Sequence, residues 1–252
     1  MTLFRLVLIA LFAFGVPIAG SAADLRVYGP GGPAPAMKEA AAAFAKLKNK
    51  DVVVTAGPTS QWRQSALNDA DLIYSGSETM MHDFVSMFDG RLKSEDVYPL
   101  YLRPSTILVR PGNPEKIGGI ADLLKPGHRI LVVNGAGQNG LWEDIAGRLG
   151  SIADVRALRS NIAAVAENSA QAKKAWTSDQ TLDAWIIWNI WQHEAPELAD
   201  LVEVEPGYRI YRDTGIAATE LGKRNPLSAE FVEFLKAKEG AAIFAKWGWI
   251  TR

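Results

Sequence analysis

The feature that most constrains this chain is a repeated order of short apolar run, small polar loop and helix. The apolar runs read as buried strands at 25–28, 51–55, 71–74, 130–133 and 184–188. Behind the first loop, the stretch 36–48 places Met37, Ala40 and Phe44 on one face of a helix. A strand that is followed by a helix each time favours parallel pairing with its neighbours. The sequence therefore predicts an α/β protein with a parallel sheet covered by helices.

Two longer extended segments interrupt this order. The first covers 98–110 and contains Pro104, and the second covers 203–218. Proline removes a donor from the strand ladder, so the first segment is either an edge strand or a strand that passes between two sheets. The pattern predicts two α/β lobes joined by two crossing strands, with the C-terminal helical segment returning to the first lobe. The expected division is 24–103 with 210–252 for lobe 1 and 104–209 for lobe 2.

The first 23 residues have the pattern of a secretory signal peptide. Arg5 is their only charge, Leu6–Phe14 is apolar, and small residues precede Asp24. We expect cleavage near Ala23 and a mature protein in the periplasm. The apolar run is shorter than the about 20 residues that a membrane span needs. The chain has no cysteine, which excludes disulfides, thiol nucleophiles and thiolate metal sites.

The charge balance excludes further classes of function. The 252 residues include 27 Lys or Arg and 28 Asp or Glu, for a net charge of −1. Such a chain has no electrostatic footprint for nucleic acid. The three histidines, His82, His128 and His193, are scattered and supply a zinc site or a His-based triad poorly. We therefore expect no metal and no cofactor.

The segment Gly135-Ala136-Gly137-Gln138-Asn139-Gly140 matches the G-x-G-x-x-G pattern of dinucleotide-binding folds. A dinucleotide site also needs an acid about 20 residues further on, at the end of the next strand. The region 151–161 contains no convincing strand that ends in Asp or Glu, and the pattern at 163–174 predicts a weak helix. We therefore interpret the loop as a cradle for some other anion and not as an NAD site.

This loop is one of four that lie between the end of a strand and the start of a helix. They are the loops 29–34, 57–60, 75–77 and 134–140. Helix N-termini offer free N–H groups and a positive dipole end, and ligands of open α/β sheets bind at the carboxyl ends of the strands. A single loop of this kind is more often a helix cap. Four together predict an anion site.

Several long segments resemble the accessory colonization factor C group. They include "DLRVYGPGGPAPAMKEAAAAF", "ADLIYSGSETMMHDF" and "ILVVNGAGQNGLWEDIAGR", and the likeness spans essentially the whole mature chain. That group is similar to the sulfate- and molybdate-type periplasmic solute-binding proteins. The resemblance implies a type II periplasmic binding protein fold, with sulfate or a sulfonate-like oxyanion in a cleft between two lobes. Carried over by position, it implies ligand contacts from Gly31, Gly32, Thr59, Ser60, Ser75, Ser77, Asn134, Gly135, Ala136, Gly137 and Gln138.

Three further candidates come from their places in the predicted fold. Arg103 lies beside Pro104 at the first crossing, where its charge either faces the cleft or is solvated or ion-paired. Arg212 lies near the second crossing and either contacts the ligand or pairs with Asp213. Trp188 ends a strand, and its ring either lines the cleft or packs in the core.

Together these observations predict a periplasmic binding protein that closes on a tetrahedral oxyanion, sulfate or an organic sulfonate, without catalysis. The expected partners are the small anion and a membrane permease or sensor, with no nucleic acid, and the expected state is a monomer. Two alternatives stay open: an exported hydrolase or transferase that acts on a phosphoryl or sulfuryl group, and an adhesion or colonization protein. The enzyme alternative lacks an evident nucleophile–base pair, because no histidine neighbours Ser60, Ser75 or Ser77 in sequence.

Overall fold

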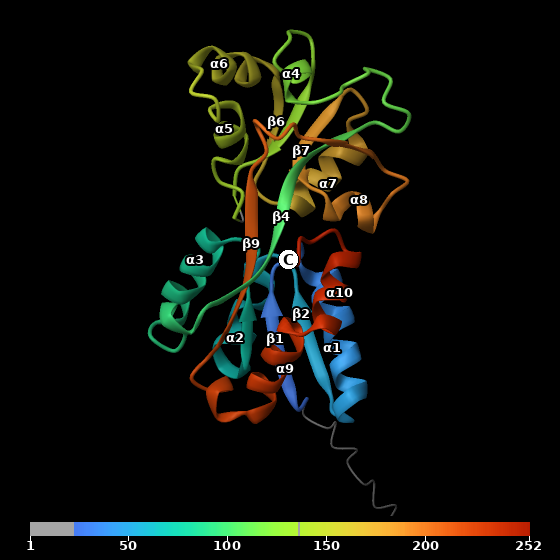
Figure 1. Ribbon diagram of the computed structural model, residues 1–252. Helices are drawn as coiled ribbons and strands as arrows, with labels where there is room; N and C mark the ends of the chain where they lie inside the picture. The colour runs from blue at the N-terminus through green and yellow to red at the C-terminus, as the bar shows by residue number, and fades with distance from the viewer. Residues whose placement is uncertain (1–22, 136) are drawn as a thin grey trace, which may run out of the picture.

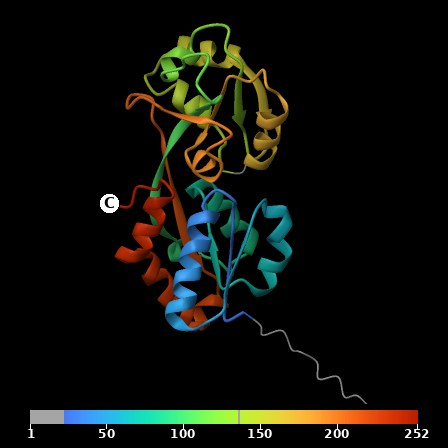
Figure 2. The same ribbon diagram turned by 90° about the vertical axis from the view of Figure 1, so that its right-hand side faces the viewer.

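The computed structural model describes residues 23–135 and 137–252. The predicted signal peptide up to residue 22, and the site candidate Ala136, lie outside the described residues. Figure 1 shows two lobes, one above the other, with the long strands β4 (Tyr98–Val109) and β9 (Tyr211–Ala218) running between them. The same two lobes are visible from the side in Figure 2, where the C-terminus lies at the level at which they meet.

Lobe 1, the lower lobe in Figure 1, holds the first three strands and the last two helices. Its elements are β1 (Leu25–Gly29), α1 (Ala34–Lys48), β2 (Val52–Ala56), α2 (Thr59–Asp69), β3 (Leu72–Tyr74), α3 (Glu78–Phe88), α9 (Pro226–Lys236) and α10 (Lys238–Lys246), with short 3-10 turns at Ser94–Asp96 and Gly222–Arg224. Strand β1 pairs in parallel with β2 and β3, and β3 pairs antiparallel with β9. Helices α9 and α10 pack beside α1, so the C-terminal segment returns to lobe 1.

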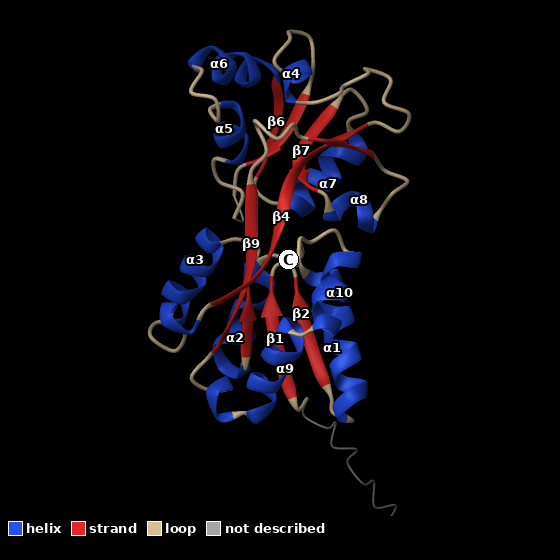
Figure 3. Cartoon of the chain, in the orientation of Figure 1, coloured by secondary structure: helices blue, strands red, loops and turns tan. Residues whose placement is uncertain are grey.

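Lobe 2 repeats the same construction around a second group of strands. Its elements are α4 (Ile120–Leu123), β5 (Ile130–Val133), α5 (Leu141–Ala146), α6 (Ile152–Asn161), β6 (Ile162–Ala166), α7 (Ser169–Ser178), β7 (Ala184–Trp188), α8 (Ile190–Glu194) and β8 (Asp200–Glu203). Strand β5 pairs in parallel with β6 and β7, and β4 pairs antiparallel with β7 and β8. In both lobes the strands form the centre and the helices the outside (Figure 3).

Strand β4 changes its partner at Pro104. Residues 98–104 of β4 pair with β9, whereas residues 105–109 pair with β7 and β8. The strand therefore passes between two sheets, which is one of the two arrangements that Pro104 predicts. The lobe boundaries at 103/104 and 209/210 stay a prediction, and the change of partner falls beside the first of them.

Each lobe has its own apolar core. Lobe 2 is built around Ile107, Val132 and Trp185, and lobe 1 around Leu25, Phe44 and Phe231, with a further cluster under α2 and α3. Chains with a separate core in each lobe can move the lobes as units about the crossing strands. Within residues 23–135 and 137–252, no helix is long and apolar enough to cross a membrane.

The structure corrects the expected helix at 163–174. Residues Ile162–Ala166 form the edge strand β6, and helix α7 begins only at Ser169. The alternating exposure of β6, with Ala163 and Val165 exposed, is the period of a strand with one face in solvent. The segment "IAAVAENSAQAK" is rich in alanine, and its alanines favoured the helical interpretation.

Candidate ligand-binding cleft

A cleft of about 170 Å³ lies between the two lobes. It is lined from lobe 1 by 30–33, 57–59, Gly76 and Met80, from lobe 2 by Gln138, 168–170, Trp188 and Trp191, and by Arg103 of the crossing strand β4. Sites for drug-sized ligands occupy roughly 300–1,000 Å³. The cleft therefore fits a small solute that touches both lobes at once.

Three helices begin at this cleft. Pro33 precedes α1, Pro58 precedes α2, and Asn168 precedes α7, and all three residues line the cleft. The first turn of a helix has free N–H groups and carries the positive end of the helix dipole. Two of these helix ends belong to lobe 1 and one to lobe 2, so an anion between the lobes is stabilised from both sides.

Arg103 is the only charged residue among the described lining residues. Its side chain is buried, and its Nη2 donates a hydrogen bond to the carbonyl of Gly76 at 2.7 Å. Its Nε and Nη1 atoms are also buried, but they have no hydrogen-bond partner within the part of the chain that the structure describes. Two nitrogens of a buried cation are therefore unpaired among the described residues, and leaving them unpaired costs free energy.

Two glycines make room for the guanidinium of Arg103. A Cβ atom on Gly32 would lie 2.7 Å from Nη1, and one on Gly76 would lie 2.8 Å from Nη2. A Cβ at either position would therefore displace the guanidinium from its present place. Glycine at both positions leaves room for it there, which gives Gly32 a role in the shape of the site.

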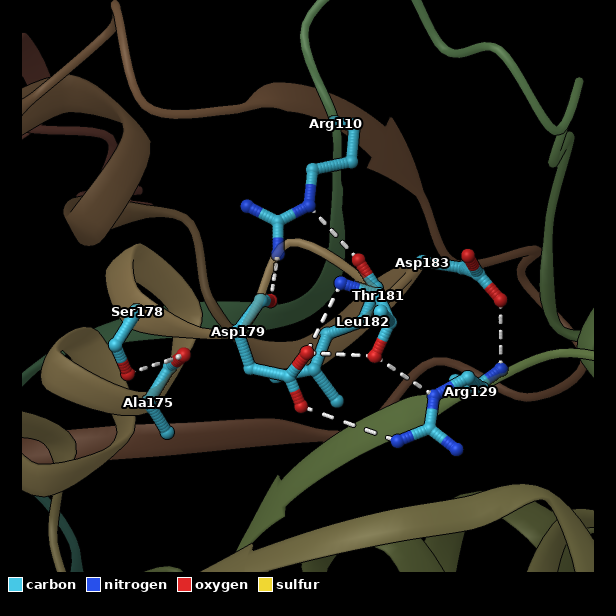
Figure 4. Close-up of polar contacts among 8 residues, drawn as sticks. All are labelled: Arg110, Arg129, Ala175, Ser178, Asp179, Thr181, Leu182 and Asp183. Atoms are coloured by element: carbon cyan, nitrogen blue, oxygen red, sulfur yellow. Dashed lines mark hydrogen bonds and ion pairs between the residues drawn. The ribbon is translucent and has the colours of Figure 1, made fainter.

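Arg110, which directly follows β4, shows what a structural arginine in this fold looks like. Its Nε donates to the carbonyl of Leu182 at 2.8 Å and its Nη2 to the carbonyl of Asp179 at 2.5 Å (Figure 4). Its Nη1 donates to the carbonyl of Trp176 at 3.0 Å. Every nitrogen of Arg110 therefore has a partner inside the protein. Arg103 differs in this respect, because only one of its three nitrogens has a partner among the described residues.

The charge of Arg103 persists at neutral pH although the side chain is buried. Burial lowers the pKa of Arg103 to about 9, and the negative charge of Asp213 on β9 acts in the opposite direction. A guanidinium with this pKa is still protonated at pH 7. No Asp, Glu or His is found among the described residues that line the cleft, so the cation is not neutralised there.

The lining of the cleft also contains residues with neutral donors. The indole Nε1 atoms of Trp188 and Trp191, both in lining residues, have no partner among the residues that the structure describes. Gln138 reaches across to Ser169, and its Nε2 donates to the Ser169 Oγ at 2.9 Å. Thr59 adds a hydroxyl from lobe 1. The cleft thus combines one cation with several neutral donors.

The structure brings six of the sequence-predicted site residues together at the cleft. They are Gly31, Gly32, Thr59, Arg103, Gln138 and Trp188. Whether any of them contacts a ligand stays a prediction. Several others do not line the cleft. Ser60 is exposed, and Asn134 is exposed with its backbone N–H bonded to the carbonyl of Ala166 at 2.8 Å.

Ser75 and Ser77 are engaged within lobe 1. The Ser75 Oγ accepts from the N–H of Gly215 at 3.2 Å, and its carbonyl accepts from the Thr214 hydroxyl. Ser77 is the N-cap of α3, and its Oγ accepts from the N–H of Met80 at 3.2 Å. Both serines therefore have the capping and strand-pairing roles that serine takes at such positions.

Arg212, Gly135 and Gly137 also have neighbours outside the cleft. Arg212 forms an ion pair with Asp144 of α5, and not with Asp213 as its sequence neighbourhood allowed. Gly135 packs against the end of β6, where a Cβ would meet the carbonyl of Glu167 at 2.2 Å. A Cβ on Gly137 would meet the Oγ of Ser77, which belongs to the other lobe, at 2.8 Å.

The sequence patterns did not predict the part of the cleft lining that lobe 2 contributes at Asn168, Ser169 and Ala170. The missed signal is the order of a strand followed by Asn168, which caps α7 by accepting from the N–H of Gln171 at 3.0 Å. This order was hidden because β6 was interpreted as helix. Gly76 belongs to the predicted loop 75–77, although it was not singled out there. Met80 and Trp191 were not among the candidates, since nothing in their local sequence distinguishes them from core residues.

The predicted absence of an acid after the next strand is wrong. The next strand does exist, as β6, and an acid, Glu167, follows it directly. The Glu167 carboxylate accepts from the Gln171 Nε2 at 3.0 Å and is not among the described lining residues. The conclusion against NAD therefore rests on this placement and on the fold, and not on a missing acid.

Two carboxyl groups lie close together, those of Glu78 in α3 and Asp213 in the second crossing strand β9. Burial and the nearby charge of Asp213 raise the pKa of Glu78 above its ordinary value of 4.5. When folding raises the pKa of an acid, the folded protein loses the stability contributed by that acid as the pH rises through the pKa of the folded state. Replacing Glu78 with glutamine should therefore raise the melting temperature slightly at pH 7 and leave it unchanged at pH 3.5. Thermal denaturation at the two pH values checks this, and an equal gain at both would contradict it.

With the fold and cleft described, comparison with known proteins identifies the class. A family model described as "Bacterial extracellular solute-binding protein" matches residues 25–250. The chain belongs to this family. The predicted periplasmic binding protein fold of two α/β lobes is thereby confirmed. The narrower resemblance to the accessory colonization factor C group stays a prediction.

Solved structures place the chain near PEB3. The crystal structure of PEB3 bound to L-phospholactate has 34% identity and a TM-score of 0.85, and the match covers 90% of this chain and all of that one. PEB3 from Campylobacter jejuni, at 33% identity and a TM-score of 0.84, is covered to the same extent. The sulfate-binding protein SubI from Mycobacterium tuberculosis H37Rv shares the fold, with 16% identity, a TM-score of 0.72 and coverage of 89% and 85%. The search of curated proteins found no match.

Proposed function

We propose that this protein captures a small anion with a fully ionised tetrahedral group, an organic sulfonate, sulfate or a phosphate ester, in the cleft between its lobes. The observation that carries the proposal is Arg103, a buried cation with two nitrogens that lack a partner among the described residues, in a cleft whose described lining contains no acid. A charged donor pair of this kind is best satisfied by an oxyanion. The ligand is then delivered to a membrane permease or a sensor, without chemistry.

The lining favours an organic anion over bare sulfate. Beside the donors, the cleft presents Pro30, Pro33, Met80, Trp188 and Trp191. These apolar surfaces gain nothing from a bare ion, whereas an organic group displaces water from them. L-phospholactate, the molecule bound to PEB3 in the structure compared above, has such an organic part. This likeness supports a phosphate ester as an alternative to the sulfonate.

An enzymatic function is less well supported by the same residues. The hydroxyls at the cleft are those of Thr59 and Ser169, and activation of either as a nucleophile needs a base within hydrogen-bond reach. Among the lining residues that the structure describes there is no histidine, aspartate or glutamate. We therefore favour capture over hydrolysis or transfer.

The protonation of the anion gives a test of the proposal. At pH 8 sulfate, sulfonates and phosphate monoesters need only donors, because the second pKa of a phosphate monoester is about 6. Inorganic phosphate keeps one proton and needs an acceptor. We expect the best of L-phospholactate, benzenesulfonate and sulfate to bind at least tenfold more tightly than inorganic phosphate, a difference of about 1.4 kcal/mol.

Isothermal titration calorimetry of the mature protein measures these four affinities, with NAD as a control that should give no saturable heat. Phosphate binding that equals the best of the others would remove the donor-only argument. If none of the three ionised probes gives saturable heat, the proposed ligand class is wrong.

A further inference from the structure

Arg103 contacts two tryptophans, one from the core of each lobe. Its guanidinium carbon lies 4.6 Å from the ring centroid of Trp188 and 5.0 Å from that of Trp249. Trp188 belongs to the core of lobe 2 and lines the cleft. Trp249 belongs to the core of lobe 1 and is not among the lining residues. A ligand in the cleft can therefore contact the ring of Trp188, whereas the ring of Trp249 lies outside the lining, although both rings contact Arg103.

The C-terminal segment holds Trp249 against the crossing strand. Ile250 donates to the carbonyl of Leu102 at 2.7 Å and accepts from the Leu102 N–H at 3.2 Å. The carbonyl of Gly248 accepts from the Asn189 Nδ2 of lobe 2 at 2.8 Å. The indole of Trp249 also packs on Phe244, edge to face, at 5.9 Å. Because Leu102 is the neighbour of Arg103, these contacts fix the ring beside the guanidinium.

We propose that Trp249 is a positioning residue for anion capture, which holds the guanidinium of Arg103 in the orientation that leaves Nε and Nη1 free. An aromatic ring attracts a guanidinium through its face, and it takes up none of the N–H donors. A carboxylate in the same place would hold Arg103 equally well, but it would occupy those donors. The proposal rests on the proposed function for the identity of the ligand.

The structure offers reasons for such a restraint. Among the described residues, the side chain of Arg103 has a single hydrogen bond, to Gly76, and arginine has many rotamers to lose on binding. A guanidinium that is fixed before the ligand arrives loses less freedom when it binds. Trp188 also contacts Arg103, but it comes from lobe 2, so its contact depends on the position of that lobe. Trp249 shares lobe 1 with Gly32 and Gly76, which shape the space around the guanidinium.

The test compares Trp249→Leu and Trp249→Phe with Trp247→Leu. Trp247 lies two residues away, and its Nε1 donates to the Glu39 carboxylate of α1 at 2.8 Å. A cation–π contact between buried groups converts to about a 3- to 30-fold change in affinity. We expect Trp249→Leu to lower the affinity for the most tightly bound of the four probes by this factor. Trp249→Phe should restore most of the loss, and Trp247→Leu should bind as the wild type does.

A double-mutant cycle separates positioning from a general loss of structure. In the Arg103→Gln background, Trp249→Leu should cause no further loss of affinity, because the side chain that it positions is absent. An equal loss in both backgrounds would contradict the proposal. A loss of melting temperature in both Trp249 variants, with unchanged affinity, would show that the ring is only part of the core.

A readout without ligand keeps the proposal distinct from the proposed function. In the ¹⁵N NMR spectrum of the unliganded protein, the Arg103 Nε–H, assigned by its absence in Arg103→Gln, should give a narrow resonance. We expect Trp249→Leu to broaden or shift it, Trp249→Phe to retain it, and Trp247→Leu to leave it unchanged. An unchanged resonance in Trp249→Leu would overturn the positioning role. This result is independent of whether any of the four probes binds.

Discussion

Replacing Arg103 with glutamine should remove most of the affinity for an ionised tetrahedral anion and leave the unliganded protein nearly as stable as the wild type. Hydrogen bonds to a charged group contribute about 1.5–3 kcal/mol each, so the loss of two such bonds weakens binding by a factor of 100 or more, on the order of 3 kcal/mol. The fold loses one hydrogen bond, to Gly76, and the contacts of the guanidinium with the rings of Trp188 and Trp249. In return, it no longer buries a cation with two nitrogens that lack a partner among the described residues. Calorimetry and thermal denaturation measure the two effects.

Arg110→Gln is the matched control for this substitution. All three of its nitrogens bond to carbonyls of lobe 2, and its guanidinium lies 3.7 Å from the ring centroid of Trp176. Its removal leaves three part-buried carbonyls without these partners, and the cost for a fully buried group is about 1–3 kcal/mol. We expect Arg110→Gln to lower the melting temperature and to change the affinity little. If Arg103→Gln instead destabilises the protein and still binds the anion, Arg103 is structural.

Replacing Gly137 with valine should lower the affinity for the same anion by more than tenfold, for a different reason. Gly137 belongs to lobe 2, and a Cβ there would lie 2.8 Å from the Ser77 Oγ and 3.0 Å from the Met80 Cε of lobe 1. Both neighbours are buried, and Ser77 is held as the cap of α3. A side chain at Gly137 therefore keeps the lobes apart, and a ligand stabilises closure only through contacts with both lobes.

Gly140→Val controls for the backbone strain of that substitution. Gly137 and Gly140 both have positive φ, 77° and 71°, but a Cβ on Gly140 has no neighbour within 4 Å. Both variants carry the strain of a β-branched residue in this region, and only Gly137→Val has the interlobe contact. Small-angle scattering with saturating probe should show a more open molecule for Gly137→Val alone. If Gly137→Val and Gly140→Val bind the anion with equal affinity, backbone strain, and not the contact between the lobes, lowers the affinity.

The strands of this fold were predictable because their apolar runs are short, continuous and bounded by glycine and polar residues. The first crossing strand was predictable for another reason: Pro104 excludes a central position in a single sheet, and the structure shows the change of partner at that residue. Strand β6 was not predictable in this way. It is an edge strand with alternating exposure, and its alanines carry too little hydrophobicity to mark which face is buried.

The candidate site was predictable at the level of loops and only in part at the level of side chains. A strand end places a loop at the cleft, but the local sequence does not say which side chains leave it toward the ligand. Ser77 faces its own helix and Thr59 faces the cleft, although both begin helices after strands. Arg103 and Arg110 both belong to or adjoin β4, and only tertiary contacts show that one is fully paired and the other is not.

The central claim is that the free N–H groups of Arg103 hold the anion. The most direct measurement follows the Arg103 Nε–H resonance during a titration with the probe that calorimetry finds to bind most tightly. The account predicts a shift that saturates at one equivalent and parallels the heat of binding, as expected when a neutral surrounding is replaced by an oxyanion. Saturable heat with no change in the Arg103 resonance would contradict it, because the anion would then be bound elsewhere.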